Sequence, residues 1–81
     1  MQPRFELYGS RSCPFTTEMR DWLEWHGHEY VEYDVDAEPA ALVRMQHLAE
    51  GQRAIPVLVQ DGRVVQIGWQ GRSCIVGNAH A

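Results

Sequence analysis

The sequence predicts a single α/β domain in which four strands form one mixed sheet. Three observations support this. The period of the hydrophobic residues alternates between about 2 and about 3.6 along the first half of the chain, which predicts the order strand, helix, strand, helix. Two apolar runs then flank Asp61-Gly62, which is a typical β-hairpin signal. The first two strands and their crossover helix form a parallel unit, and the hairpin adds antiparallel strands to the same sheet.

Alternation and capping residues define the first strand and the first helix. Residues 4–8 alternate apolar and polar side chains up to the breaker Gly9. Apolar residues at helical spacing then follow, with Pro14 suited to the first helical position and Gly27 suited to the C-terminal cap. We therefore expect a strand over residues 4–8 and a helix over residues 14–26.

The second strand and the second helix are recognised in the same way. Residues 29–35 alternate acidic side chains with aliphatic and aromatic ones, which predicts a half-buried strand. Acidic residues and Pro39 come next, and both favour the start of a helix. Helical spacing of apolar residues predicts that this helix extends through residues 40–49, and Gly51 ends it.

The hairpin and the end of the chain complete the predicted fold. We expect the hairpin strands, over residues 55–59 and 63–67, to be buried because both are rich in aliphatic residues. The segment 69–81 is rich in Gly, Ser and Asn and is expected to be irregular. We therefore read residues 1–81 as one domain with a core over 4–68.

Charge and hydropathy restrict the class of partner. The net charge is −4, and the seven basic residues are all arginines scattered along the chain, so a nucleic acid is a poor choice of partner. No apolar stretch approaches the roughly 20 residues of a membrane span, and the first residues contain no apolar leader segment. We expect a cytoplasmic protein that binds neither nucleic acid nor membrane.

Cys13 is the strongest candidate for a reactive group. It lies between the first predicted strand and the first predicted helix, at the N-cap position before Pro14. The positive end of the helix dipole and the N–H groups of Phe15 and Thr16 lower the pKa of a thiol there, and the thiolate is the nucleophile. Arg11 adds a nearby cation, and the Thr16 hydroxyl is a further donor. This setting favours a catalytic cysteine over one that falls in a turn by chance.

Three segments resemble the glutaredoxin family. Y-G-S-R-S-C-P-F-T at residues 8–16 resembles its active-site loop, which contains C-P-Y/F-C. G-Q-R-A-I-P at residues 51–56 resembles its G-x-R-T-V-P segment, and Ile67-Gly68 fall where its Gly-Gly motif begins. The resemblance covers residues 4–68 and implies a trimmed thioredoxin-like fold, strand-helix-strand-helix-strand-strand. The C-terminal helix that is usual in the family is expected to be short or absent.

The resemblance also implies a substrate groove beside Cys13. The pair matching Ile55-Pro56 carries a cis peptide bond in the family, and the backbone before the proline pairs with a peptide-like substrate. Glutathione is the family's co-substrate, although Trp69 in place of the second glycine weakens the site for its γ-glutamyl end. The residues expected to bind substrate or glutathione are Pro14, Phe15, Gln52, Arg53, Ile55, Pro56, Gly68 and Trp69.

Thr16 stands where the family's C-x-x-C motif has its second cysteine. A disulfide across that motif cannot form, so two routes remain. In a monothiol cycle, Cys13 attacks a mixed disulfide, becomes glutathionylated and is released by a second thiol. In the other route Cys74 folds back and acts as the resolving thiol, whereas an inert Cys74 leaves only the first. The departures from the family pattern suggest similarity to small monothiol C-P-x-T glutaredoxin-like proteins related to bacterial glutaredoxin-like selenoproteins.

The expected function is a monothiol thiol-disulfide oxidoreductase or electron carrier that reduces mixed or protein disulfides. Its reductant is glutathione or a thioredoxin-reductase-like enzyme, and no bound cofactor or metal site is expected. Two alternatives remain open: glutathione-dependent iron-sulfur cluster binding, against which Pro14 argues by stiffening the loop, and a non-catalytic regulatory redoxin.

Overall fold

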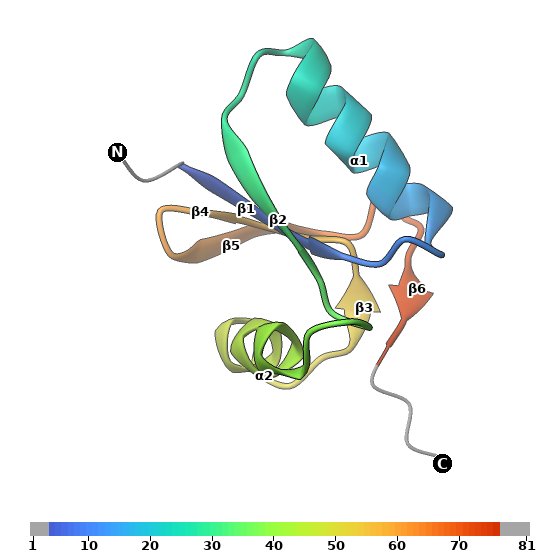
Figure 1. Ribbon diagram of the computed structural model, residues 1–81, viewed down its shortest axis with the longest axis vertical. Coiled ribbons are helices and arrows are strands. Elements are labelled where there is room, and N and C mark those ends of the chain that lie inside the picture. The colour runs from blue at the N-terminus through green and yellow to red at the C-terminus, as the bar shows by residue number, and fades with distance from the viewer. Residues whose placement is uncertain (1–3, 77–81) are drawn as a thin grey trace.

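The computed structural model describes residues 4–76 and folds them into a mixed sheet with a helix on each face (Figure 1). The sheet has the order β2-β1-β4-β5, in which β1 is parallel to β2 and antiparallel to β4, and β4 is antiparallel to β5. This confirms the predicted four-stranded mixed α/β sheet. The elements are β1 (Phe5–Gly9), α1 (Pro14–Trp25), β2 (Tyr30–Asp34), α2 (Pro39–Leu48), β3 (Ala54–Ile55), β4 (Val57–Gln60), β5 (Arg63–Ile67) and β6 (Cys74–Ile75).

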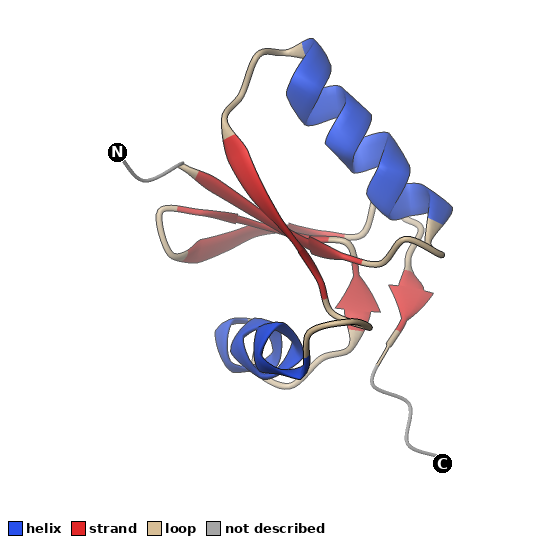
Figure 2. Ribbon diagram, viewed as in Figure 1, coloured by secondary structure: helices blue, strands red, loops and turns tan. Residues whose placement is uncertain are grey.

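Alternation of side chains along the central strands divides the core into two layers. On one face of the sheet, Leu7 and Leu58 belong to a buried cluster with Met19 of α1. On the other face, Val57 belongs to a second buried cluster with Met45 of α2. The central strands β1 and β4 therefore lie between the two helices, as the arrangement in Figure 2 shows. Neither helix within residues 4–76 is long and apolar enough to cross a membrane.

The two predicted helices are confirmed, and their boundaries differ from the predicted ones by at most one residue. Pro14 and Pro39 occupy the first positions of α1 and α2, where the missing proline N–H has no intrahelical acceptor to serve. His26 is the C-cap of α1 rather than its last helical residue. No helix follows α2 in the described residues.

The predicted hairpin forms, but the burial predicted for its second strand is wrong. Asp61 and Gly62, with φ angles of 52° and 82°, connect β4 to β5. β5 forms an edge of the sheet, and four of its five residues are exposed, Val65 and Ile67 among them. Aliphatic residues alone predicted burial, whereas the position of a strand at an edge depends on the whole sheet.

The predicted strand over residues 55–59 is divided in two at Pro56. The Ile55–Pro56 peptide bond is cis, as the resemblance implies. Proline lacks an N–H for the ladder, so β3 ends at Ile55 and β4 begins at Val57. β4 joins the main sheet, whereas β3 pairs with β6 in a separate two-stranded ladder.

The segment 69–81, expected to be irregular, contains regular structure in its described part, and residues 77–81 lie outside it. Trp69 and Arg72 exchange two backbone hydrogen bonds, of 2.7 and 2.9 Å, across a tight turn. Gln70 and Gly71 form this turn with φ angles of 52° and 78°. The chain then reverses and runs through β6 beside β3 (Figure 1).

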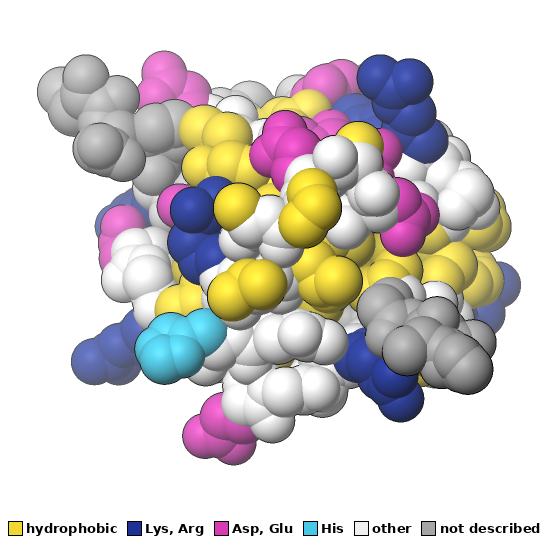
Figure 3. Space-filling model, turned by 60° about the horizontal axis from the view of Figure 1, so that its bottom comes forward, with side chains coloured by type: hydrophobic (Ala, Val, Ile, Leu, Met, Phe, Trp, Pro, Cys, Tyr) yellow, Lys and Arg dark blue, Asp and Glu magenta, His cyan; other side chains and the backbone are white. Residues whose placement is uncertain are grey.

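Side chains of different kinds are mixed on the surface seen in Figure 3. Hydrophobic side chains gather in the middle of this view, with acidic side chains and separate arginines around them. The exposed large hydrophobic residues include Val43 of α2 and Ile75 of β6.

Candidate active site

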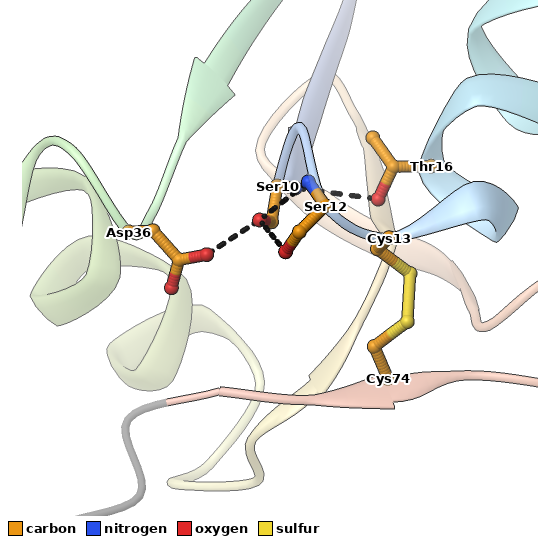
Figure 4. The surroundings of a disulfide bond; sticks show 6 residues. All are labelled: Ser10, Ser12, Cys13, Thr16, Asp36 and Cys74. Atoms are coloured by element: carbon orange, nitrogen blue, oxygen red, sulfur yellow. Dashed lines mark hydrogen bonds between the residues drawn. A yellow bond between two sulfur atoms is a disulfide. The ribbon is translucent and has the colours of Figure 1, made fainter.

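A disulfide bond joins Cys13 to Cys74 (Figure 4). The two residues are 61 positions apart in the chain, and their Cα atoms are 6.0 Å apart. Cys13 is the N-cap of α1, as predicted, and only 1% of it is exposed. Cys74 is the first residue of β6 and is half-buried. The structure therefore brings together the two cysteines whose relation the sequence left open.

The path from Gly68 to Cys74 depends on close backbone approaches. The Gly68 N–H donates to the Pro56 carbonyl at 2.7 Å, which ties the end of the hairpin to the start of β4. Gly68 has a φ of +83°, and a Cβ atom there would lie 2.8 Å from the Arg72 carbonyl oxygen. Glycine at this position therefore lets the turn fold back so that Cys74 lies opposite Ile55.

Hydrogen bonds that converge on Ser10 hold the loop before Cys13 (Figure 4). The Ser10 hydroxyl donates to an Asp36 carboxylate oxygen at 2.5 Å and lies 3.0 Å from the Ser12 hydroxyl. The Ser10 hydroxyl also accepts the Ser12 N–H at 3.2 Å, and the Ser10 carbonyl accepts the Cys13 N–H at 3.1 Å. Sequence reasoning missed Ser10, Ser12 and Asp36. The two serines that flank Arg11 were the available local signal, whereas Asp36 is 26 positions from Ser10.

Thr16 lies beneath the same loop and is fully buried. Its hydroxyl oxygen accepts the Ser10 N–H at 3.3 Å, and its N–H donates to the Cys13 carbonyl at 3.1 Å. A Cβ atom on Gly9 would lie 2.9 Å from the Thr16 Cβ and still closer to its branches. In this oxidised state Thr16 supports the loop, and its contact with a Cys13 thiolate stays a prediction.

Arg11 and Arg72 contact residues other than Cys13 in this structure, and the effect predicted for Arg11 on the Cys13 thiol stays a prediction. The Arg11 side chain is 94% exposed, and its Nε lies 3.9 Å from an Asp34 carboxylate oxygen. An exposed ion pair at this distance contributes little to the stability of the fold. Arg72, which sequence reasoning did not select, lies with its guanidinium 4.9 Å from the centre of the Phe15 ring on the first turn of α1. The structure thus places Arg72 over that turn and pairs Arg11 with an acid.

The residues expected to bind glutathione support β3 in this state. The Gln52 side chain accepts the Ala54 N–H at 2.7 Å and donates to the Ala54 carbonyl at 3.2 Å. The Arg53 carbonyl accepts the Val76 N–H at 2.9 Å. Ile55 and Pro56 are buried beside the disulfide-linked strand. Ile55 therefore lies opposite Cys74 in the β3–β6 ladder, and glutathione binding by these residues stays a prediction.

Trp69 packs against α1. Its indole N–H donates to the Glu18 carboxylate at 3.0 Å, and its ring centre lies 6.4 Å from that of Trp22. With Phe5 and Leu58 it lines a cavity between α1 and the sheet. These contacts favour a packing role for Trp69.

One buried phenol lies two residues before the loop. Burial raises the pKa of Tyr8 to about 12, because the phenolate is poorly solvated there. Arg44 donates to the Tyr8 oxygen at 3.0 Å and opposes this shift, whereas the Glu6 carboxylate, which accepts the Tyr8 hydroxyl at 2.9 Å, adds to it. Tyr8 is therefore neutral at physiological pH.

Comparison with known proteins identifies the family. Residues 5–65 match the glutaredoxin family model. The chain belongs to the glutaredoxin family. A relative of this glutaredoxin, a probable glutaredoxin of Synechocystis sp., is 32% identical over 62 residues, which make up 75% of this chain and 57% of that protein. The chain therefore spans a little over half the length of this curated relative.

Solved structures agree with this glutaredoxin's fold. A thioredoxin-like protein of 30% sequence identity superimposes with a TM-score of 0.72, over 82% of this chain and 88% of that one. The glutaredoxin from Archaeoglobus fulgidus, at 18% identity, gives a TM-score of 0.74 over 85% of this chain and 78% of that one. The predicted thioredoxin-like fold is thus confirmed, and the narrower similarity to monothiol C-P-x-T proteins stays a prediction.

Proposed function

We propose that this glutaredoxin is a thiol-disulfide oxidoreductase that uses Cys13 as nucleophile and Cys74 as resolving thiol. The observation that carries the proposal is the disulfide between these residues. The Cys13 thiolate attacks one sulfur of a substrate disulfide and displaces the other sulfur as a thiolate. Cys74, as a thiolate, then attacks the Cys13 sulfur, forms the intramolecular disulfide and releases the remaining substrate thiolate. Two electrons pass from the dithiol to the substrate.

The position of Cys13 favours it as the attacking thiol. It occupies the N-cap position of a helix of 12 residues, where the positive end of a helix dipole favours a thiolate once the disulfide opens. Cys74 lies on β6, so its own backbone is not part of a helix N-terminus, and only its bond to Cys13 brings its sulfur to α1. This asymmetry supports a fixed order, in which Cys13 reacts with substrate and Cys74 reacts with Cys13.

Recycling requires a donor of two electrons. Two glutathione molecules or a thioredoxin-reductase-like enzyme supply them by reducing the Cys13–Cys74 disulfide. Mixed disulfides and protein disulfides are the proposed substrates. The turn at 69–72 supports a weakened preference for glutathione, because Trp69 and Arg72 close it on each other through their own backbone hydrogen bonds.

The test is a disulfide reductase assay coupled in parallel to glutathione and to thioredoxin reductase. Wild-type protein should turn over with at least one reductant, and Cys13→Ser should abolish turnover. Cys74→Ser should retain attack on glutathione mixed disulfides but lose most turnover of protein disulfides. If Cys74→Ser and wild type turned over protein disulfides equally, the result would support the monothiol cycle instead. Folded wild-type protein without turnover in either assay would contradict the proposal.

A further inference from the structure

β6 pairs with β3 along the edge of the active site. Ile55 lies opposite Cys74, and Ala54 lies opposite Ile75. Because β3 is outside the main sheet, this two-residue ladder is its only strand pairing among residues 4–76. If β6 left, the backbone groups of β3 would need water or another strand as a partner. The ladder therefore covers the backbone edge of β3, and its residue Cys74 is bonded to Cys13.

The covalent bond and the ladder meet at one residue. Cys74 is both the residue opposite Ile55 and the residue bonded to Cys13. A mixed disulfide with a partner protein would put the partner's cysteine sulfur on Cys13, in place of the Cys74 sulfur. An extended partner segment around that cysteine could then form the same ladder with β3, which is a common mode of peptide recognition.

We infer that β6 occupies, in the oxidised protein, the binding site of an extended cysteine-containing segment of the substrate. This inference rests on the proposed function, because it needs Cys13 to form a mixed disulfide. Reduction frees Cys74 from Cys13 and leaves the short ladder and the buried Val76 side chain to hold β6, so a substrate strand that makes the same contacts can replace it. Resolution by Cys74 then returns β6 to the edge and releases the product.

The exposure of Ile75 in β6 and the burial of Val76 directly after it indicate which substrate side chains the site would recognise. Val76, two residues after the cysteine, is 7% exposed and belongs to the buried cluster that contains Met45 and Val57. Ile75, directly after the cysteine, is 64% exposed. Successive residues of a strand point to opposite sides, so only the second position enters the core. The substrate class is therefore a segment with the pattern cysteine, any residue, apolar residue of about the size of valine.

The experiment uses the full-length Cys74→Ser protein with glutathione attached to Cys13 as a mixed disulfide. A blocked peptide with the sequence of residues 72–76, Arg-Ser-Cys-Ile-Val, is added in its thiol form. Its thiolate attacks the Cys13 sulfur, forms the new mixed disulfide and releases glutathione as a thiolate. The equilibrium constant of this exchange is measured by mass spectrometry. Two matched peptides carry serine in place of the valine or in place of the isoleucine.

We expect serine in place of the valine to lower the equilibrium constant about tenfold or more, because the buried contact is lost. Serine in place of the isoleucine should change it less than about threefold, because that side chain stays in solvent. The protein's own β6 segment competes equally with all three peptides. The ratios of the three equilibrium constants therefore measure the contribution of each peptide side chain to binding at the site.

The outcomes separate the inference from the proposed function. Equal constants for the three peptides would overturn the inference and leave the oxidoreductase proposal intact. A larger decrease of the equilibrium constant with the isoleucine replacement would also overturn the inference, because the site would then recognise the side chain that the structure leaves in solvent. Folded protein that takes no glutathione onto Cys13 from glutathione disulfide would contradict the proposed function itself.

Discussion

Ser10 is the residue on which the geometry of the cysteine loop depends. Its carbonyl, N–H and hydroxyl are all used, by Cys13, Thr16 and the pair of Asp36 and Ser12. Ser10 is buried, so each of these groups would cost free energy if it lost its partner. Asp36, which lies between β2 and α2, thereby positions a loop that belongs to a different part of the chain.

Replacing Asp36 tests this positioning. Asp36→Ala removes the acceptor of the Ser10 hydroxyl and should lower the free energy of unfolding by about 1.5–3 kcal/mol, the usual value for a hydrogen bond to a charged group. Asp36→Asn keeps an acceptor oxygen and should retain most of that stability. Urea unfolding measures the change, and amide hydrogen exchange at Cys13 should accelerate in the alanine variant. If the Cys13 amide of Asp36→Ala exchanged at the same rate as that of the wild type, the positioning role would be contradicted.

The Tyr8 phenol provides a pH-dependent signal. Since burial raises its pKa from 10.0 to about 12, the folded protein holds the phenolic proton more tightly than the unfolded chain does. The contribution of the raised Tyr8 pKa to the stability of the folded protein is complete below pH 10 and is lost as the pH rises through about 12. The phenolate absorbance of wild type minus that of Tyr8→Phe should therefore have its midpoint well above pH 10. A difference curve centred at the ordinary tyrosine value would disprove this.

At the scale of elements, the end of β1 is packed directly on the first turn of α1. Gly9→Ala should lower the free energy of unfolding by about 1–3 kcal/mol, because the added Cβ collides with the Thr16 side chain. Thr16→Ser removes one of the colliding branches, so the double variant should lose less than the sum of the single changes. Thermal unfolding of the four proteins measures this coupling. Strict additivity would show that the two side chains do not meet.

Elements with local signals were predictable from the sequence, and those set by long-range pairing were not. Pro14 at a helix start and Asp61-Gly62 in a turn act within a few residues, and both predictions are confirmed. The exposure of β5 depends on its place at the sheet edge, which its own residues do not encode. β6 has two residues and no periodic pattern, and it forms because a turn and a disulfide return the chain to β3.

The same division applies to the site. Cys13 was identifiable because strand, cysteine, proline and helix follow one another in the chain. Cys74 could be named only as a candidate, because its approach to Cys13 depends on the turn that begins at Trp69. Asp36 was missed because a hydrogen bond between loops that are far apart in the chain produces no periodic pattern in the sequence. The pairing of Arg11 with Asp34 was missed for the same reason.

For the whole molecule, the disulfide closes a loop that includes most of the chain. With 61 positions between its ends, its loss should cost up to about 4 kcal/mol, mainly because the unfolded chain gains conformational entropy. Reduction should therefore lower the Tm of wild-type protein by roughly 10 °C or more, since 1 kcal/mol corresponds to roughly 4–8 °C in a domain of this size. Calorimetry with and without a phosphine reductant measures this shift. Cys74→Ser is the control and should show no response to the reductant.

The tight turn of residues 69–72 makes the connection from the end of the hairpin to Cys74 a short tether. In a C-x-x-C protein both sulfurs lie on one helix, so their separation is fixed by helix geometry. Here the effective concentration of the Cys74 thiol at Cys13 depends on the length and stiffness of a loop, and it would fall as flexible residues are inserted. Small changes in this exposed turn could therefore shift the balance between intramolecular closure and reaction with an outside thiol, with both cysteines and the rest of the fold unchanged.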